Sequence, residues 1–221
     1  MFISKLLDGI DACIFDMDGT LIDSLHVWED IDKRFFNIHD MQVPKDYDKM
    51  IAHMSFIEMA EFTKKKYKFK ESVFEIIEMW LNWSKEAYVN TIEEKENVKE
   101  VLSYLKEKHI PLSLATANKK ELYEPCLLRL DLNKYFDYVL NINDINSTKQ
   151  EPTIYLNLAD KMNAKVERTL VFEDILMAVQ TAKKANFKVC GIYDKSNIRD
   201  EDEIKKVSDY YLYSFSSLEL K

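Results

Sequence analysis

The sequence has few cysteines and histidines, and neither type follows the spacing of a metal site. Cys13, Cys126 and Cys190 lie far apart in apolar segments, and no Cys-x-x-Cys pair or Cys/His zinc pattern occurs. The four histidines form no ligand pattern either. This usage predicts reduced thiols in the core of a cytoplasmic protein.

Long apolar runs and basic stripes are also missing. No apolar stretch reaches membrane-spanning length, and the first residues lack a signal-peptide pattern. The net charge is −8, and glutamates flank the short basic run at 64–66. We therefore expect a protein that binds neither membrane nor nucleic acid. Its 221 residues, 47% of them hydrophobic, suit a globular chain with an insertion, by default a monomer.

Short apolar segments rich in Ile, Val, Leu and Tyr alternate with amphipathic helical patterns from residue 94 onward. The predicted strands are 12–15, 111–115, 138–142, 169–172, 188–193 and 209–213. The predicted helices between them are 94–108, 119–130, 153–162 and 175–186. This alternation predicts an α/β fold with a doubly wound, Rossmann-like parallel sheet. Asn118 and Asp174 precede two of these helices and are predicted to cap them.

Residues 24–90 break the alternation, with helical periodicity and no convincing strand. We predict helices at 26–37, 56–67 and 72–88. The segment is too long for a connection within a compact sheet domain. It is therefore predicted to be a helical domain inserted after the first strand, leaving 1–23 and 91–221 as the α/β core.

Acidic side chains follow two of the predicted strands. Asp16 and Asp18 end the first strand, and Glu173 and Asp174 follow the strand at 169–172. Ionised acids are rarely buried unless they are paired or bind a metal. Gly19, one of three glycines in the chain, permits a sharp turn directly after the first pair.

Thr116 follows the second predicted strand, and Lys149 precedes the helix that begins near Pro152. The carboxyl ends of parallel strands share one edge of a sheet, so these residues are expected to converge with the acids. Four carboxylates in a small space need a cation or must take up protons. Oxygen ligands suit Mg²⁺, and an added ammonium and hydroxyl would make a phosphate cradle.

These segments resemble, in order, the four signature motifs of the haloacid dehalogenase superfamily. The motifs are Asp-Met-Asp-Gly-Thr at 16–20, Thr116, Lys149 with Pro152, and Glu173-Asp174. The resemblance spans essentially the whole chain and is closest to β-phosphoglucomutase- and phosphoglycolate phosphatase-like members. In these members a helical cap occupies the position of residues 24–90. Gln150 departs from the pattern, because relatives often carry proline there, as does 175–178, where they often have Ser-x-x-Gly.

The resemblance implies a role for each motif. Asp16 would be the nucleophile that forms an aspartyl-phosphate, and Asp18 the general acid and base. The implied Mg²⁺ ligands are Asp16, Asp18 through its backbone carbonyl, Asp174 and Glu173. The implied phosphate-binding residues are Thr116, Ala117 and Lys149. Asn118, Trp28 and Phe56 are possible contacts to the substrate, which the cap would enclose.

The leading hypothesis is thus a Mg²⁺-dependent phosphatase that acts on a small phosphorylated metabolite. Asp18 argues against a dehalogenase, because halide departure needs no acid. A β-phosphoglucomutase-like mutase is the first alternative, although such enzymes carry a cap histidine where Trp28 falls and an arginine near Phe56. A non-catalytic binding protein is the second alternative. Loss of Asp16 or Asp18 would mark it, and both are present.

Overall fold

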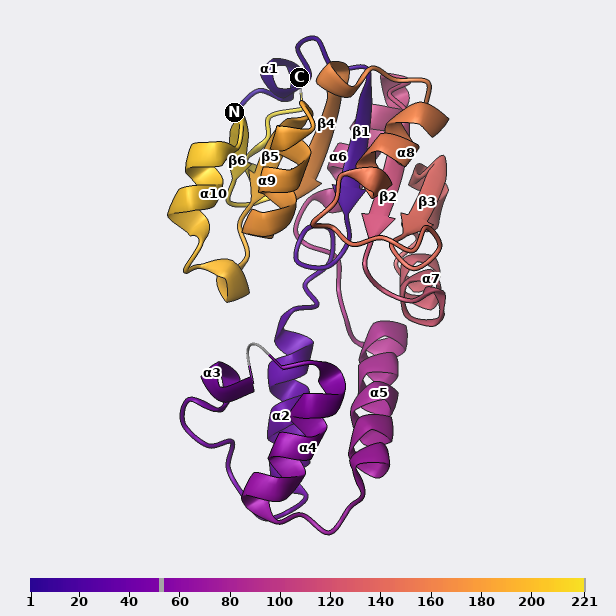
Figure 1. The fold of residues 1–221 in the computed structure, drawn as a ribbon. Coiled ribbons are helices and arrows are strands. Elements are labelled where there is room, and N and C mark those ends of the chain that lie inside the picture. Colours follow the sequence, from indigo (N-terminus) through magenta and orange to yellow (C-terminus); the bar gives the residue numbers. More distant parts are fainter. Residues whose placement is uncertain (52–53, 221) are drawn as a thin grey trace. The chain divides into compact units, whose positions relative to one another are not determined.

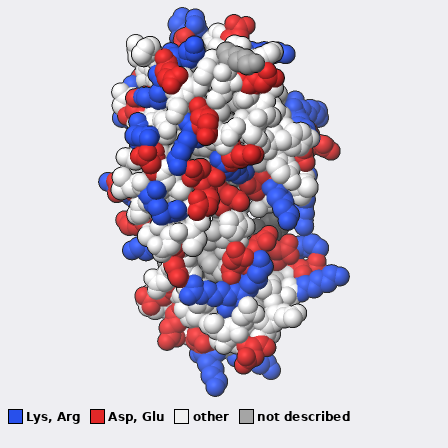
Figure 2. Space-filling view, turned by 180° about the vertical axis from the view of Figure 1, so that it is seen from behind, with Lys and Arg blue, Asp and Glu red and all other residues white. Residues whose placement is uncertain are grey.

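The computed structural model describes residues 1–51 and 54–220, which form two compact units (Figure 1). The first unit contains Met1–Leu25 and Ile92–Lys221, and the second contains His26–Thr91. Among the described residues, no helix is long and apolar enough to cross a bilayer. On the face shown in Figure 2, acidic and basic side chains are interspersed.

The first unit is built on a six-stranded parallel sheet, as the sequence predicts. Its order is β3-β2-β1-β4-β5-β6. The strands are β1 (Ala12–Asp16), β2 (Leu112–Thr116), β3 (Tyr138–Asn141), β4 (Thr169–Glu173), β5 (Lys188–Ile192) and β6 (Tyr210–Leu212). All six predicted strands are confirmed, as is the α/β class. Because β1 pairs with β2 on one side and β4 on the other, the first acidic motif lies at the centre of the sheet.

Helices cover both faces of this sheet (Figure 1). They are α1 (Ile3–Leu6), α6 (Val98–Glu107), α7 (Lys120–Arg129), α8 (Thr153–Lys161), α9 (Leu176–Lys184) and α10 (Glu201–Val207). Successive side chains of β1 point to opposite faces of the sheet. Ile14 packs in a cluster with residues of α8, α9 and α10. On the other face Phe15 stacks on Phe172, with 4.3 Å between ring centroids.

The prediction that a helix begins at residue 94 is wrong, because residues 94 and 95 bond to the segment after β1. Glu94 forms an antiparallel bridge with Ile22, and the Lys95 amide donates to the Leu21 carbonyl at 2.8 Å. Helix α6 therefore begins at Val98. Helices α1 and α10 are too short for hydrophobic periodicity to reveal, and the sequence did not predict them.

The second unit is a helical bundle with an aromatic core. It contains α2 (His26–Asn37), α3 (Tyr47–Ile51), α4 (Phe56–Tyr67) and α5 (Val73–Asn90). The predictions for α2 and α4 match residue for residue, and Ser72 caps α5 with a capping box to Glu75. Phe35 lies edge-on to Phe36, Phe69 and Trp80, with centroids 5.1–6.1 Å apart. These contacts bury the aromatic side chains in which this segment is rich.

A half-buried carboxylate on α2 makes the stability of the second unit depend on pH. Burial, and then the negative charges of Glu29 and Asp48, raise the pKa of Asp32 to about 7. The unfolded chain has an aspartate pKa of about 3.9, so folding takes up a proton at this group. The stability that Asp32 contributes is therefore complete below about pH 4 and is lost as the pH rises through 7.

We expect Asp32→Asn to unfold at a higher temperature than the wild type at pH 8, because the amide cannot ionise. The difference should shrink as the pH is lowered toward 4 in a series of thermal unfolding curves. Asp40→Asn, at an exposed site of the same unit, is the control and should leave the pH profile unchanged. Superimposable profiles for Asp32→Asn and the wild type would refute this account.

Candidate active site

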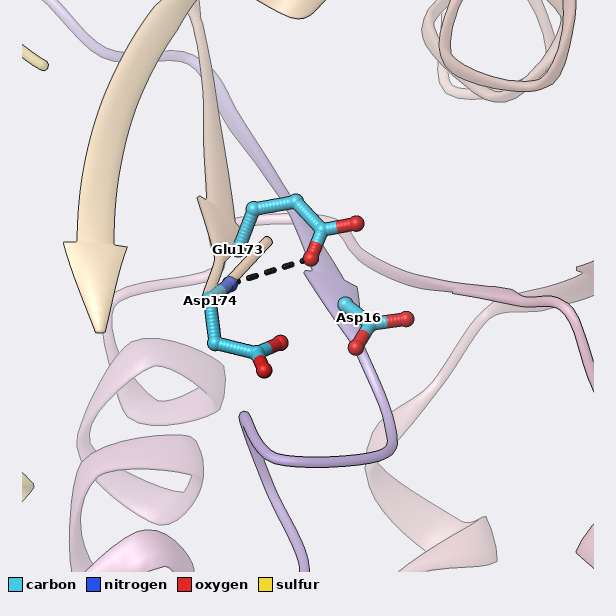
Figure 3. Close-up of side chains that lie close together, drawn as sticks. All are labelled: Asp16, Glu173 and Asp174. Carbon is cyan, nitrogen blue, oxygen red and sulfur yellow. Dashed lines mark hydrogen bonds between the residues drawn. The ribbon is translucent and has the colours of Figure 1, made fainter. Parts of the chain in front are cut away.

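Three buried carboxylates meet at the carboxyl end of the sheet (Figure 3). Asp16 is the last residue of β1, Glu173 is the last residue of β4, and Asp174 follows directly. One oxygen of each lies within 4.8 Å of one oxygen of the others. Because β1 and β4 are neighbours in a parallel sheet, residues 157 positions apart in sequence come together, as the sequence predicts.

Lys149 is the positive charge within this group. Its ammonium donates to an Asp16 oxygen and, at 2.6 Å, to Glu173 Oε1, and the side chain is 7% exposed. The Tyr155 hydroxyl on α8 also donates to Glu173 Oε1, at 3.1 Å, and the Asp174 amide donates to Glu173 Oε2. Glu173 is thus fixed by three donors, which orient it toward Lys149 and Asp16.

The charges of the site do not balance without a cation. Three ionised carboxylates and one ammonium sum to −2. Burial, followed by repulsion from Glu173, raises the pKa of Asp16 to about 8, although Lys149 opposes the shift. Burial, followed by repulsion from Glu173 and Asp16, raises the pKa of Asp174 well above its ordinary value. A divalent cation fits this donor set, because it would restore neutrality and these hard oxygen ligands are the type that Mg²⁺ prefers.

Asp174 is held from two further sides. The Thr20 hydroxyl donates to its Oδ1 at 3.1 Å, and the Asn197 amide donates to its Oδ2 at 2.7 Å. Gly19 has a φ of +79°, and a Cβ atom there would collide with the Asp174 carboxylate. The prediction that Asp174 caps α9 is wrong: Ile175 is the N-cap and makes no side-chain cap bond. The carboxylate turns toward the other acids instead.

Asp18 has different surroundings from the three grouped carboxylates. It lies beyond the end of β1 and is half-buried. Its Oδ1 accepts a hydrogen bond from Ser24 at 2.7 Å, and its Oδ2 accepts one from the Asn118 amide at 2.5 Å. The Asp18 charge still reaches Asp16 and contributes to the raised pKa of that group. The two aspartates of the first motif are therefore neighbours with separate hydrogen-bond partners.

The loop after β2 brings three predicted site residues together. Thr116 is buried, and its Oγ1 accepts a hydrogen bond from the Asn118 backbone at 3.1 Å, while Ala117 between them is exposed. The prediction that Asn118 caps α7 is wrong, because Lys119 is the N-cap and makes no side-chain cap bond. The Asn118 side chain instead donates from Nδ2 to the Asp18 carboxyl group across the site.

Trp28 and Phe56 belong to the second unit. Trp28 is 42% exposed, and its ring lies edge-on to Phe56 with 5.7 Å between centroids. Their role as substrate contacts stays a prediction. The sequence motifs indicated neither Tyr155 nor Asn197, because both residues lie outside them. Asn197 follows β5, so the rule that parallel strands end at one edge could have found it.

Residues 13–192 match the model of haloacid dehalogenase-like hydrolases. The chain belongs to this family. It is therefore a member of a hydrolase family, as the four motifs indicated, and all four lie within the matched range.

Named relatives agree with this assignment. A phosphorylated carbohydrates phosphatase of Thermotoga maritima is 28% identical over 189 residues, which are 85% of this chain and 88% of the relative. Pyrophosphatase PpaX of Halalkalibacterium halodurans is 24% identical over 95% of each chain. A crystal structure of a Thermotoga maritima protein whose name relates it to β-phosphoglucomutase superposes with a TM-score of 0.79. It is 26% identical and covers 92% of this chain and 94% of its own.

The raised pKa of Asp16 predicts a pH-dependent stability of the metal-free hydrolase. The folded-state pKa of about 8 exceeds the unfolded value of about 3.9, so the stability this group contributes is complete below about pH 4 and lost as the pH rises through 8. With EDTA present, Asp16→Asn should unfold at a higher temperature than the wild type at pH 8 and above, and the gap should close toward pH 4.

Thermal unfolding across this pH range measures the effect. Asp8→Asn, at an exposed position of the same unit, is the matched control and should follow the wild type. Added Mg²⁺ should raise the unfolding temperature of the wild type much more than that of Asp16→Asn, because binding to the folded state stabilises it. A wild type as stable as Asp16→Asn at pH 8 without metal would contradict the proposed charge imbalance.

Proposed function

We propose that the chain is a Mg²⁺-dependent phosphatase that transfers a phosphoryl group first to Asp16 and then to water. The observation that carries the proposal is the buried group of three carboxylates with Lys149. Such a group combines a nucleophile, a cation site and a fixed positive charge, which are the parts that phosphoryl transfer needs. The phosphatase names of two relatives support the same activity.

Asp16 is the proposed nucleophile. One of its oxygens attacks the phosphorus atom, the bond from phosphorus to the leaving oxygen breaks, and an aspartyl-phosphate forms. Lys149 contacts Asp16 and keeps this carboxylate oriented. Asp16, Glu173, Asp174 and the backbone carbonyl of Asp18 would hold Mg²⁺, which when bound supplies positive charge to the phosphoryl oxygens and to the carboxylates.

Asp18 is the proposed general acid and base. In the first step it gives a proton to the leaving oxygen, and in the second it takes a proton from the water that attacks the aspartyl-phosphate. Phosphate then leaves and Asp16 is restored as a carboxylate. The bonds from Ser24 and Asn118 fix both oxygens of Asp18, so that the same group can serve both steps.

We propose that Thr116, Ala117 and Lys149 bind the phosphoryl oxygens of the substrate. The Thr116 hydroxyl accepts a bond from the Asn118 backbone, which leaves its hydrogen directed to another acceptor such as a phosphoryl oxygen. The Lys149 ammonium and the backbone amide of Ala117 complete the set. These groups are held by β2 and by the pairing with Asp16, so they need little reorganisation when phosphate binds.

We propose a small phosphorylated metabolite as the substrate, with phosphorylated carbohydrates as the first class to test because of the named Thermotoga relative. The unit His26–Thr91 would act as the cap that selects the substrate. The chain would work in the cytoplasm, which agrees with its three buried free thiols, and by default as a monomer.

Release of phosphate from a panel of sugar phosphates, nucleotides, pyrophosphate and small phosphorylated acids tests the activity. Asp16→Asn should lower turnover by about a thousandfold or more, because it removes the nucleophile at constant volume. EDTA should have a comparable effect on the wild type, and Asp8→Asn should keep full activity. Wild-type turnover in Asp16→Asn would refute the assignment.

A β-phosphoglucomutase-like activity is the competing outcome, since one similar structure carries a related name. A mutase would convert a sugar 1-phosphate to the 6-phosphate without releasing phosphate, and phosphorus NMR distinguishes the two products. Metal-dependent isomerisation that needs Asp16 would replace the phosphatase proposal.

The proposed substrate contacts predict a change in selectivity. Trp28→Ala and Phe56→Ala should change the ratio of kcat/KM between two substrates of the panel by about tenfold, because each removes a large ring from a proposed contact with the substrate. Phe74→Ala, at a residue of α5 that is 67% exposed, is the matched control and should leave the ratio unchanged. An unchanged ratio in both ring variants would remove them from the proposed site.

A further inference from the structure

Asn197 donates to Asp174 through two hydrogen bonds from a single amide nitrogen. Its Nδ2 lies 2.7 Å from Asp174 Oδ2 and 3.3 Å from the Asp174 backbone carbonyl. Thr20 donates to the other carboxylate oxygen, at 3.1 Å. Both carboxylate oxygens of Asp174 therefore have a neutral side-chain donor. Thr20 belongs to the first motif, whereas Asn197 lies outside all four motifs.

We infer that Asn197 is a positioning residue that orients Asp174 for a divalent cation. The inference rests on the proposed metal-dependent function. A partner that fixes the orientation of a metal-binding carboxylate raises metal affinity, because the ligand no longer loses rotational freedom when the ion binds. Within the part of the chain that the structure describes, the Asn197 side chain donates to Asp174 and to neither Asp16 nor Glu173, so its effect passes through Asp174.

An amide suits this position because it donates without carrying charge. The carboxylates already outnumber the ammonium of Lys149, and this excess of negative charge attracts the cation. A lysine in place of Asn197 would cancel part of that excess, and an aspartate would offer no donor to Asp174. The amide keeps both the orientation of the ligand and the charge of the site.

A rigid turn holds Asn197 in place. Asn197 ends the short 3-10 helix Lys195–Asn197, which follows β5 and begins at the N-cap Asp194. Asp194 is 7% exposed; its Oδ1 accepts from the Ser196 amide at 2.8 Å, and its Oδ2 from the Lys95 ammonium at 2.8 Å. Lys95 also donates to the Tyr193 carbonyl at 2.9 Å. This turn and Asp174 belong to the same unit.

The test is the Mg²⁺ affinity of the metal-free protein, measured by titration calorimetry without substrate. Asn197→Ala should weaken binding by about 10- to 100-fold. The Mg²⁺ concentration for half-maximal phosphate release should rise by the same factor, while kcat at saturating Mg²⁺ stays within about threefold of the wild type. Ser196→Ala, an exposed side chain in the same turn, is the matched control and should bind Mg²⁺ as the wild type does.

Asp194→Asn provides a second test of the same inference. It keeps an acceptor for the Ser196 amide but loses the ion pair to Lys95, so it should weaken Mg²⁺ binding in the same direction and by less than Asn197→Ala. This variant carries the test if Asn197→Ala does not fold.

Two results would overturn the inference while leaving the phosphatase intact. One is an unchanged Mg²⁺ affinity in Asn197→Ala. The other is a loss of kcat and thermal stability with no change in metal dependence, which would show a structural role only. If instead the wild type bound no divalent cation, the proposed function would fail together with this inference, and the wild-type titration alone would show it.

Discussion

The site depends on the burial of three carboxylates against one ammonium. Asp16, Glu173 and Asp174 are withdrawn from water, and Lys149 offsets only part of their charge. Buried carboxylates in such a group are stable only if they take up protons or are neutralised by a cation. The raised pKa of Asp16 is a consequence of this burial and of the excess of negative charge. This arrangement suits the proposed chemistry, because the carboxylates would attract a cation and the Lys149 ammonium would attract a phosphoryl group without further reorganisation.

The fold holds these charged side chains close together. Strands β1 and β4 are adjacent, parallel and fully buried, so their last residues cannot separate without breaking the centre of the sheet. Packing on both faces fixes these strands, through Ile14 on one side and the Phe15–Phe172 stack on the other. Around the carboxylates, hydrogen bonds from Tyr155, Thr20 and Asn197 fix individual oxygens. Stability of the core thus supports a locally unfavourable arrangement of charge.

The sequence predicts the sheet and its acidic edge because both depend on local pattern. Apolar segments that end in acidic residues can be recognised in the sequence itself. Because parallel strands end at one edge of the sheet, Asp16 and Asp174 can then be predicted to lie close together. Side-chain partners are less accessible. Asn118 and Asp174 occupy sequence positions that are typical of helix N-caps. Asn118 instead donates to Asp18, and Asp174 accepts from Asn197, because hydrogen bonds between side chains compete with local capping. Tyr155 and Asn197 carry no motif, and only the fold shows what they contact.

We expect Asp16 to become phosphorylated during each turnover. An Asp18→Asn variant incubated with Mg²⁺ and p-nitrophenyl phosphate, whose leaving group needs little acid assistance, should accumulate the intermediate, because its hydrolysis lacks a general base. Mass spectrometry after an acid quench should show one added phosphoryl group, located on the peptide that contains Asp16 and absent when Asp16→Asn is combined with Asp18→Asn. Metal-dependent release of phosphate with no phosphoryl group on Asp16 would contradict the account, because water would then attack the substrate directly.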